Sequence, residues 1–228
     1  MVYTILRRII RLLLQFILAS IGGFAGYVFI FLVMSILGLV ASLLNFIIHI
    51  LLFPPLGFTA MLVIYIGMPA GSLLGIFLSD RFIFRIRTYG CMAAVIGYIF
   101  SVFTMASIIV LPWITKKDLF VFIAKLDEWF YPFISALTCV IGYNLLGLIT
   151  RETCSFKEVF ARQNILIMGL SSLLAIFITA YVYHGKNYGG LDIDLGLVML
   201  EIAFPVLMFC AWFFNRSKNP DKSRRIPL

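Results

Sequence analysis

At residues 67–75 the chain reads Gly67-Met-Pro-Ala-Gly71-Ser-Leu-Leu-Gly75. We expect the rest of the protein to pack around this stretch. Glycine recurs at every fourth position inside an apolar run, and residues four apart share one face of a helix. A glycine face lets a second helix approach to backbone distance, which drives helix association in lipid. Pro69 cannot donate to the carbonyl of Tyr65, so a kink is expected. We interpret the stretch as the packing face of a central membrane helix; the alternative is a hinge or a broken helix that lines a pathway.

The composition of the whole chain requires a lipid environment. Of its 228 residues, 63% are hydrophobic and 12% are charged, whereas soluble domains carry roughly 45–50% apolar and about 25% charged residues. The net charge of +8 resides in short basic clusters beside apolar runs, which indicates membrane orientation and not nucleic-acid binding. The four cysteines include no Cys-x-x-Cys pair, so the sequence predicts neither a metal site nor a disulfide framework.

The basic clusters set the expected topology. Lys and Arg gather on the cytoplasmic side of a membrane, and arginine clusters both precede and follow the apolar run 12–79. Both clusters then lie on one side, which requires an even number of crossings between them. We predict an all-α, polytopic membrane protein with about six transmembrane helices and both termini cytoplasmic. The predicted spans are residues 14–36, 57–79, 89–112, 130–150, 164–184 and 196–214.

Two segments between these spans are expected at the outer membrane surface. Residues 37–56 end near a Pro-Pro pair, which favours an interfacial or re-entrant helix. Residues 113–129 repeat apolar side chains at three- and four-residue spacing among charged ones, which is typical of an amphipathic surface helix. The expected division is a single transmembrane domain over residues 1–215 and a basic cytoplasmic tail over residues 216–228.

Two local motifs refine this prediction. Gly22 and Gly26 give the first span a small face of its own, which we expect to meet the glycine stripe of the second span. Ser155-Phe-Lys-Glu158 matches a capping box, in which each of two side chains bonds a free backbone N–H of the other residue. A helix is expected to start at this box and to continue into the fifth span.

Glu201 is the candidate centre of function. Every other acidic residue is expected in a connecting segment, whereas Glu201 falls inside the sixth span. An ionisable group within a membrane is a functional candidate by default. Pro205 cannot bond the Glu201 carbonyl, so this residue offers both a carboxyl and a free carbonyl oxygen. The alternative is that Glu201 only fixes helix packing.

Other polar groups are expected at the same outer depth as Glu201, by counting the rise along each helix. Together they predict a polar pocket for a proton, a cation or a small polar ligand. Its expected residues are Glu201, Tyr65, His49, His184, Asn45 and Tyr181. A metal site at the two histidines is not favoured, because they lack the short spacing of metal ligands. The positions expected to act in helix packing or as hinges are Gly67, Pro69, Gly71, Gly75 and Pro205.

Three classes of function remain open. The first, which we favour, is a small permease or channel-like protein in which Glu201 and the proline breaks shape a path. The second is a non-catalytic subunit or assembly partner whose glycine faces and interfacial helices dock other membrane chains. The third is an intramembrane enzyme acting on lipid, which we place last because two histidines and one acid within a span give little catalytic equipment. The expected partners are the lipid bilayer and either other membrane proteins or further copies of this chain. No cofactor is expected, and the expected location is an inner or plasma membrane.

Overall fold

The computed structural model describes residues 2–44, 61–84, 89–115, 130–150, 155–188 and 193–217. Within these ranges the chain is helical and contains no extended strand. Five helices are long and apolar enough to cross a membrane: Ile5–Leu37, Val63–Ile83, Cys91–Val110, Tyr131–Thr150 and Arg162–Val182. A shorter apolar segment, Met199–Phe214, follows near the end of the described chain. The prediction of an all-helical protein is therefore confirmed for the described residues, and several of its helices have the length and composition to cross a membrane, while a count of six crossings stays a prediction.

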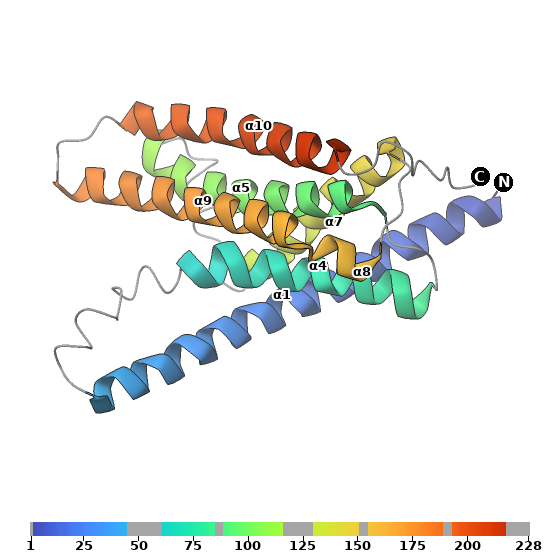
Figure 1. Ribbon diagram of the computed structural model, residues 1–228, viewed down its shortest axis with the longest axis horizontal. Coiled ribbons are helices and arrows are strands. Elements are labelled where there is room, and N and C mark those ends of the chain that lie inside the picture. Colours follow the sequence, from blue (N-terminus) through green and yellow to red (C-terminus); the bar gives the residue numbers. More distant parts are fainter. Residues whose placement is uncertain are drawn as a thin grey trace.

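The helices run back and forth along the bundle. They are α1 (Val2–Leu44), the π-helical turn η1 (Val63–Gly67), α4 (Met68–Leu78), the π-helical turn η2 (Ser79–Ile83), α5 (Cys91–Thr115), α7 (Tyr131–Thr150), α8 (Phe156–Val159), α9 (Arg162–Tyr188) and α10 (Ile193–Ser217). Successive long helices point in opposite directions (Figure 1), so the start of α1 and the end of α10 lie toward the same end of the molecule.

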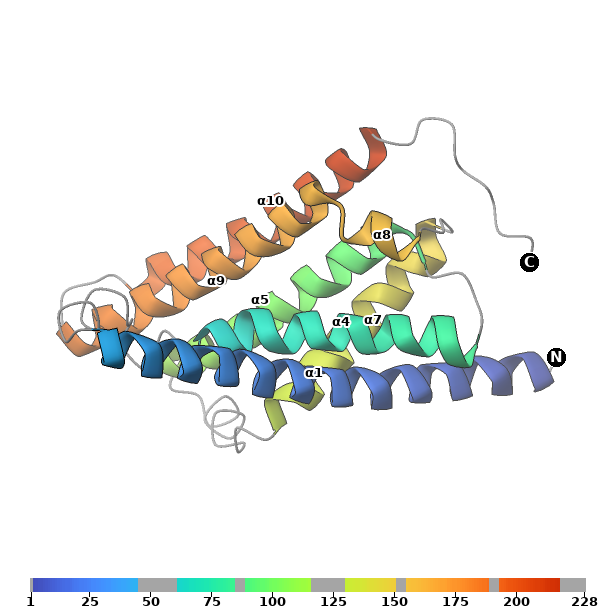
Figure 2. The ribbon, with the colours of Figure 1, turned by 60° about the horizontal axis from the view of Figure 1, so that its bottom comes forward.

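Helix α5 lies in the middle of the bundle. It packs against α7, α9 and α10, while α1 packs mainly against α4 and α7. Figure 2 shows α1 beside α4 on one side and α9 beside α10 on the other, with the two pairs diverging toward the end that carries α8. The bundle is thus made of two helix pairs held together by the central helices α5 and α7.

The glycine stripe at residues 67–75, which begins in η1 and continues along α4, lies directly against α1. A Cβ atom built on Gly67 would lie 2.8 Å from the carbonyl oxygen of Gly26, and one built on Gly71 would lie 2.7 Å from the carbonyl carbon of Gly22. Gly75 meets the backbone of α1 at Leu18 in the same way. Side chains at these positions would force the two backbones apart, so the contacts support the packing interpretation of the stripe.

Helix α1 is longer than predicted. It begins at Val2 and ends at Leu44, so it includes the basic cluster that was expected to precede span 14–36. The first part of segment 37–56 continues this helix, and the rest of that segment lies outside the described residues. No proline interrupts residues 2–44. Because every backbone N–H in lipid must be bonded, an uninterrupted sequence of this kind continues as a helix.

The capping box is confirmed, but the helix that it starts is short. The Ser155 N–H donates to the Glu158 carboxylate at 2.8 Å, and the Glu158 N–H donates to the Ser155 hydroxyl at 3.4 Å. Helix α8 nevertheless ends at Val159, and α9 begins at Arg162. The Asn164 side chain donates to the Glu158 carbonyl at 2.9 Å and thereby holds this break. The expected continuous helix is therefore wrong.

The remaining expected segments are only partly described. Residues 113–115 continue α5 and residues 216–217 continue α10. The rest of the predicted surface helix, 116–129, and of the basic tail, 218–228, lies outside the described residues.

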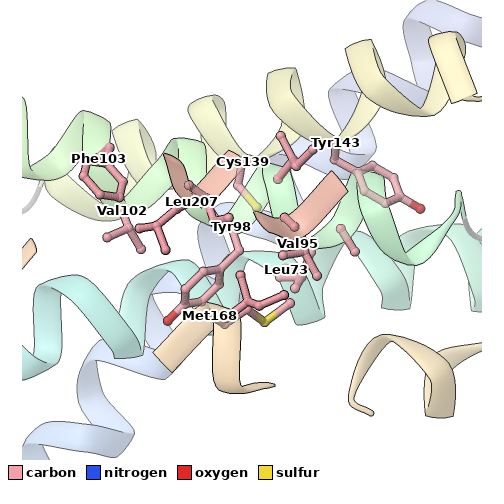
Figure 3. Close-up of a cluster of buried hydrophobic side chains, with 14 of the residues drawn as sticks. Leu73, Val95, Tyr98, Val102, Phe103, Cys139, Tyr143, Met168 and Leu207 are labelled. Atoms are coloured by element: carbon pink, nitrogen blue, oxygen red, sulfur yellow. The ribbon is translucent and has the colours of Figure 1, made fainter. Parts of the chain in front are cut away.

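The buried core surrounds α5. Val95, Tyr98, Val102 and Phe103 extend from this helix into a cluster with side chains of the neighbouring helices (Figure 3). The apolar part of the cluster is completed by Leu73, Cys139, Met168 and Leu207, all of them buried. The hydroxyls of Tyr98 and Tyr143 point out of it in opposite directions (Figure 3), each toward a separate group of polar side chains.

Candidate functional site

Asp80 is a fully enclosed acid. It is the second residue of η2, and among the residues whose side chains are described it is the one completely buried carboxylate. Its Oδ1 atom accepts a hydrogen bond from Arg11 Nε at 3.0 Å, and its Oδ2 atom accepts one from Arg11 Nη2 at 2.9 Å. This two-pronged geometry is the strongest form of an arginine–carboxylate pair.

Further polar groups complete the coordination of this carboxylate. Gln15 Nε2 donates to Oδ1 at 2.8 Å, and the Tyr143 hydroxyl donates to Oδ2 at 3.1 Å. Asn144 Nδ2 in turn donates to Gln15 Oε1 at 2.9 Å. The Arg11 guanidinium lies 4.8 Å from the ring centre of Tyr89, where it gains a cation–π contact. We call these residues the Asp80 network: Arg11, Gln15, Asp80, Tyr89, Tyr143 and Asn144.

Local helix geometry explains how the Asp80 network forms. Arg11 and Gln15 are four residues apart on α1 and therefore share one face. Ala19, which is completely buried, continues that face, and Gly22 follows it against α4. The close approach permitted by the glycines thus brings the two polar side chains of α1 within reach of Asp80.

A second polar cluster surrounds Tyr65. The Tyr65 hydroxyl lies 2.7 Å from Thr179 Oγ1, with either atom as the donor. The Tyr65 carbonyl accepts from Ser172 Oγ at 2.8 Å and from the Tyr98 hydroxyl at 3.3 Å. This carbonyl is the one that Pro69 leaves without a helical donor. The helix widens there into η1, where the Met68 N–H bonds back to Val63.

Buried serines form a third cluster. Ser101 Oγ lies 2.9 Å from Ser135 Oγ, and Ser72 Oγ lies 3.5 Å from the same atom. All three side chains are completely buried. They come from α5, α7 and α4, so the cluster joins three helices at the middle of the bundle.

Polar side chains therefore recur along one segment of the chain. Tyr65, Ser72 and Asp80 each have an exposed fraction of 0%. They are seven and eight residues apart in the sequence, which is about two helical turns in each case. Each belongs to a different one of the three clusters. We call these three residues the polar line.

The structure does not bring the expected pocket residues together around Glu201. Glu201 is exposed, and Tyr65 lies in the core with Thr179 instead of beside it. Tyr181 is half-buried on α9. His184 belongs to the same helix, but its side chain is not among those described. Asn45 and His49 lie outside the described residues.

Glu201 lines a groove between α5 and α10. This groove has a volume of about 250 Å³. Its lining residues are Phe100, Phe103, Thr104, Ser107, Leu200, Glu201 and Phe204. A larger cavity of about 610 Å³ lies between α9 and α10 and is lined by apolar side chains alone. Pro205, the expected break in α10, lies inside that helix and is exposed.

The expectation that Glu201 is the one acid outside the connecting segments is wrong, because the apolar helical segment Val63–Ile83 contains Asp80. Asp80 follows the predicted second span directly and is followed by Arg81, so by position alone it belonged to a connecting segment. A signal was present in the spacing of Arg11 and Gln15, which places a second polar side chain on the face of Arg11 where the apolar run of α1 has already begun. Such a face requires a polar partner on another helix.

Comparisons with known proteins return no match: no protein-family model, no curated protein and no solved structure is similar to this chain. Among the described residues, no three His, Cys, Asp or Glu side chains lie close enough together to hold a metal ion. The function must therefore be argued from the geometry of the polar clusters.

Proposed function

We propose that the protein is a small membrane permease or channel-like protein, and that a proton is the species it carries. The observation that carries this proposal is the buried Asp80–Arg11 pair at one end of the polar line. Removing a carboxylate and a guanidinium from water costs several kcal/mol per ion, on the order of what their attraction returns. Packing alone does not require such a pair, because apolar side chains of similar size serve equally well. Its presence points to a functional role.

The position of the polar line supports the same proposal. It runs along the segment Val63–Ile83, which contains both π-helical turns. Irregular turns of this kind are frequent at functional sites, and membrane transporters place their binding sites where helices are irregular. Asp80 and Tyr65 both lie within such turns.

A proton fits these clusters better than a hydrated solute. Hydroxyl groups both donate and accept, so Tyr65 and Ser72 can pass a proton on without an open pore. Successive members of the polar line are about 10–12 Å apart along the helix axis, which exceeds hydrogen-bond distance. Transfer between them therefore requires the helices to separate enough to admit water. Arg11, with 15% of its side chain exposed, closes the Asp80 end of this route.

A flux assay tests this proposal. Purified protein is reconstituted into liposomes that contain a pH-sensitive dye, and a potassium diffusion potential is imposed with valinomycin. We expect faster acidification than in protein-free liposomes. Wild-type protein that gives no more flux than empty liposomes would overturn the proposal.

Two variants locate the route. Arg11→Leu combined with Asp80→Leu removes both charges together, so neither is left buried alone, and we expect this variant to fold but to lose the flux. Glu158→Gln is the matched control, because glutamine also satisfies a capping box and Glu158 lies outside the polar clusters. Full flux through the double variant would exclude the Asp80 network from the route.

A second candidate function is that of a subunit of a larger membrane complex. The observation that favours it is the exposed side of α1. In an apolar 18-residue stretch of α1, 17% is buried within the bundle, compared with 72% in such a stretch of Val63–Ile83. Large apolar side chains cover that side, among them Ile21, Phe29 and Ile36, each at least 60% exposed. Native mass spectrometry in mild detergent distinguishes the two. A stoichiometric complex with other chains would favour the subunit, and a monomer or homo-oligomer would favour the permease.

A further inference from the structure

Glu201 has no oppositely charged partner among the described residues. It lies eight residues after the start of α10, about 12 Å along the helix axis. It is exposed, and within the described part of the chain it forms no hydrogen bond or ion pair. A carboxylate at such a position in a membrane is costly unless an opposite charge accompanies it. A bound cation would supply that charge.

The groove that Glu201 lines is also lined by aromatic side chains. Phe100 and Phe103 from α5 and Phe204 from α10 line the same groove as Glu201. The Phe103 and Phe204 ring centres are 5.5 Å apart, and those of Phe100 and Phe204 are 6.2 Å apart. The faces of aromatic rings carry negative partial charge and attract cations, above all quaternary ammonium groups.

The hydroxyls of the groove also favour a cation. Thr104 Oγ1 donates to the Phe100 carbonyl at 2.8 Å, and Ser107 Oγ donates to the Phe103 carbonyl at 2.8 Å. Their protons are therefore engaged, and their oxygens remain as acceptors. The described lining thus offers a carboxylate, acceptor oxygens and aromatic rings, a set that favours a cation over an anion.

An inorganic ion does not suit this lining. Calcium takes about six to eight oxygen ligands, and magnesium demands near-ideal octahedral geometry. Among the described residues, Thr104, Ser107 and Glu201 supply the oxygen-bearing side chains of the groove, and the other described lining residues are apolar. An organic cation, by contrast, is weakly hydrated and gains from contact with apolar walls.

We infer that the groove between α5 and α10 binds the head group of a lipophilic organic cation, a quaternary ammonium or a protonated amine. Its volume of about 250 Å³ is below the roughly 300–1,000 Å³ of sites that enclose drug-sized ligands. The groove therefore holds the charged head, while the hydrocarbon part of the ligand stays in the lipid. This inference stands apart from the proposed proton transport, because binding needs no gradient and no flux.

A binding assay on the full chain in an uncharged maltoside detergent tests the inference. The probe is hexyltrimethylammonium, observed by saturation-transfer NMR. The comparison compound is 2,2-dimethyloctane, in which carbon replaces the charged nitrogen and the shape is kept. We expect saturable binding of the cation and none of the neutral compound. Equal binding of both, or no binding of the cation, would overturn the inference.

Two variants test whether the probe binds in the groove. Glu201→Gln should weaken binding by at least about tenfold, whereas Glu158→Gln, the matched control, should bind as the wild type does. Phe204→Leu keeps an apolar wall but removes a ring face, so binding should weaken about fivefold. Wild-type affinity in Glu201→Gln would overturn the inference. The comparison of the two compounds needs only the wild-type protein, so it tests the inference even where a variant fails to fold.

Discussion

Arg11 and Asp80 meet across the contact between the first two long helical segments, joined by two parallel hydrogen bonds of 3.0 and 2.9 Å. Asp80 is completely buried, and 15% of the Arg11 side chain is exposed. The pair is within reach only because glycines let the two backbones touch further along the same helices. The ion pair therefore depends on the close glycine packing of the same two helices.

Asp80→Asn should destabilise the protein by about 3–5 kcal/mol, because it leaves the charge of Arg11 largely buried without its partner. Thermal unfolding in detergent, followed by circular dichroism, measures the loss. The double variant Arg11→Leu with Asp80→Leu should lose less stability than Asp80→Asn, since no charge is left unpaired and only the neutral donors Gln15 and Tyr143 lose their acceptor. Equal losses in the single and the double variant would contradict this account.

Gly71→Ala should destabilise the protein by roughly 1–3 kcal/mol. The added methyl group would meet the backbone of Gly22, which cannot rotate away as a side chain can. Gly169→Ala provides the matched control on α9, because no described atom lies within 4 Å of a Cβ built there. That change should be neutral or stabilising by about 0.5–1 kcal/mol, the ordinary gain from alanine in a helix. Urea unfolding in mixed micelles compares the two, and equal effects would contradict the close contact.

Ser172→Ala should cost about 1–3 kcal/mol, because the buried Tyr65 carbonyl loses its shorter hydrogen bond. The hydroxyl of Ser35 bonds only within its own exposed helix, to the Phe31 carbonyl at 2.8 Å. Ser35→Ala should therefore change stability by less than about 0.5 kcal/mol. A similar shift in the thermal unfolding of both variants would show that the Tyr65 carbonyl does not depend on Ser172.

Cys139 should resist alkylation by N-ethylmaleimide in the folded protein, because it is completely buried between α5 and α7. Cys210 is half-buried on α10 and should react faster. Peptide mass spectrometry after timed labelling measures both in one sample. Labelling of Cys139 at the rate of Cys210 would contradict the described core.

The candidate site was only partly predictable from the sequence. Proline chemistry at Pro69 pointed to the Tyr65 carbonyl, which accepts hydrogen bonds from Ser172 and Tyr98. Glu201 was singled out correctly as an acid within a helix, but it lies exposed in a groove and not beside Tyr65. Depth along a helix can be counted from the sequence, whereas the direction of a side chain around the bundle depends on how the helices pack.

The helical class of the protein and several of its local motifs follow from neighbouring residues alone. Apolar runs of membrane-crossing length, the four-residue spacing of Gly67, Gly71 and Gly75, and the Ser155–Glu158 box are properties of neighbouring residues. Lipid and backbone hydrogen bonding act on them directly. The burial and pairing of Asp80, by contrast, depend on how distant helices pack. Its partners Arg11, Gln15 and Tyr143 are 69, 65 and 63 residues away along the chain. An acid beside a basic segment can lie in a loop or form a buried ion pair. Which of the two it does depends on the side chains that pack against it, and these come from distant parts of the chain.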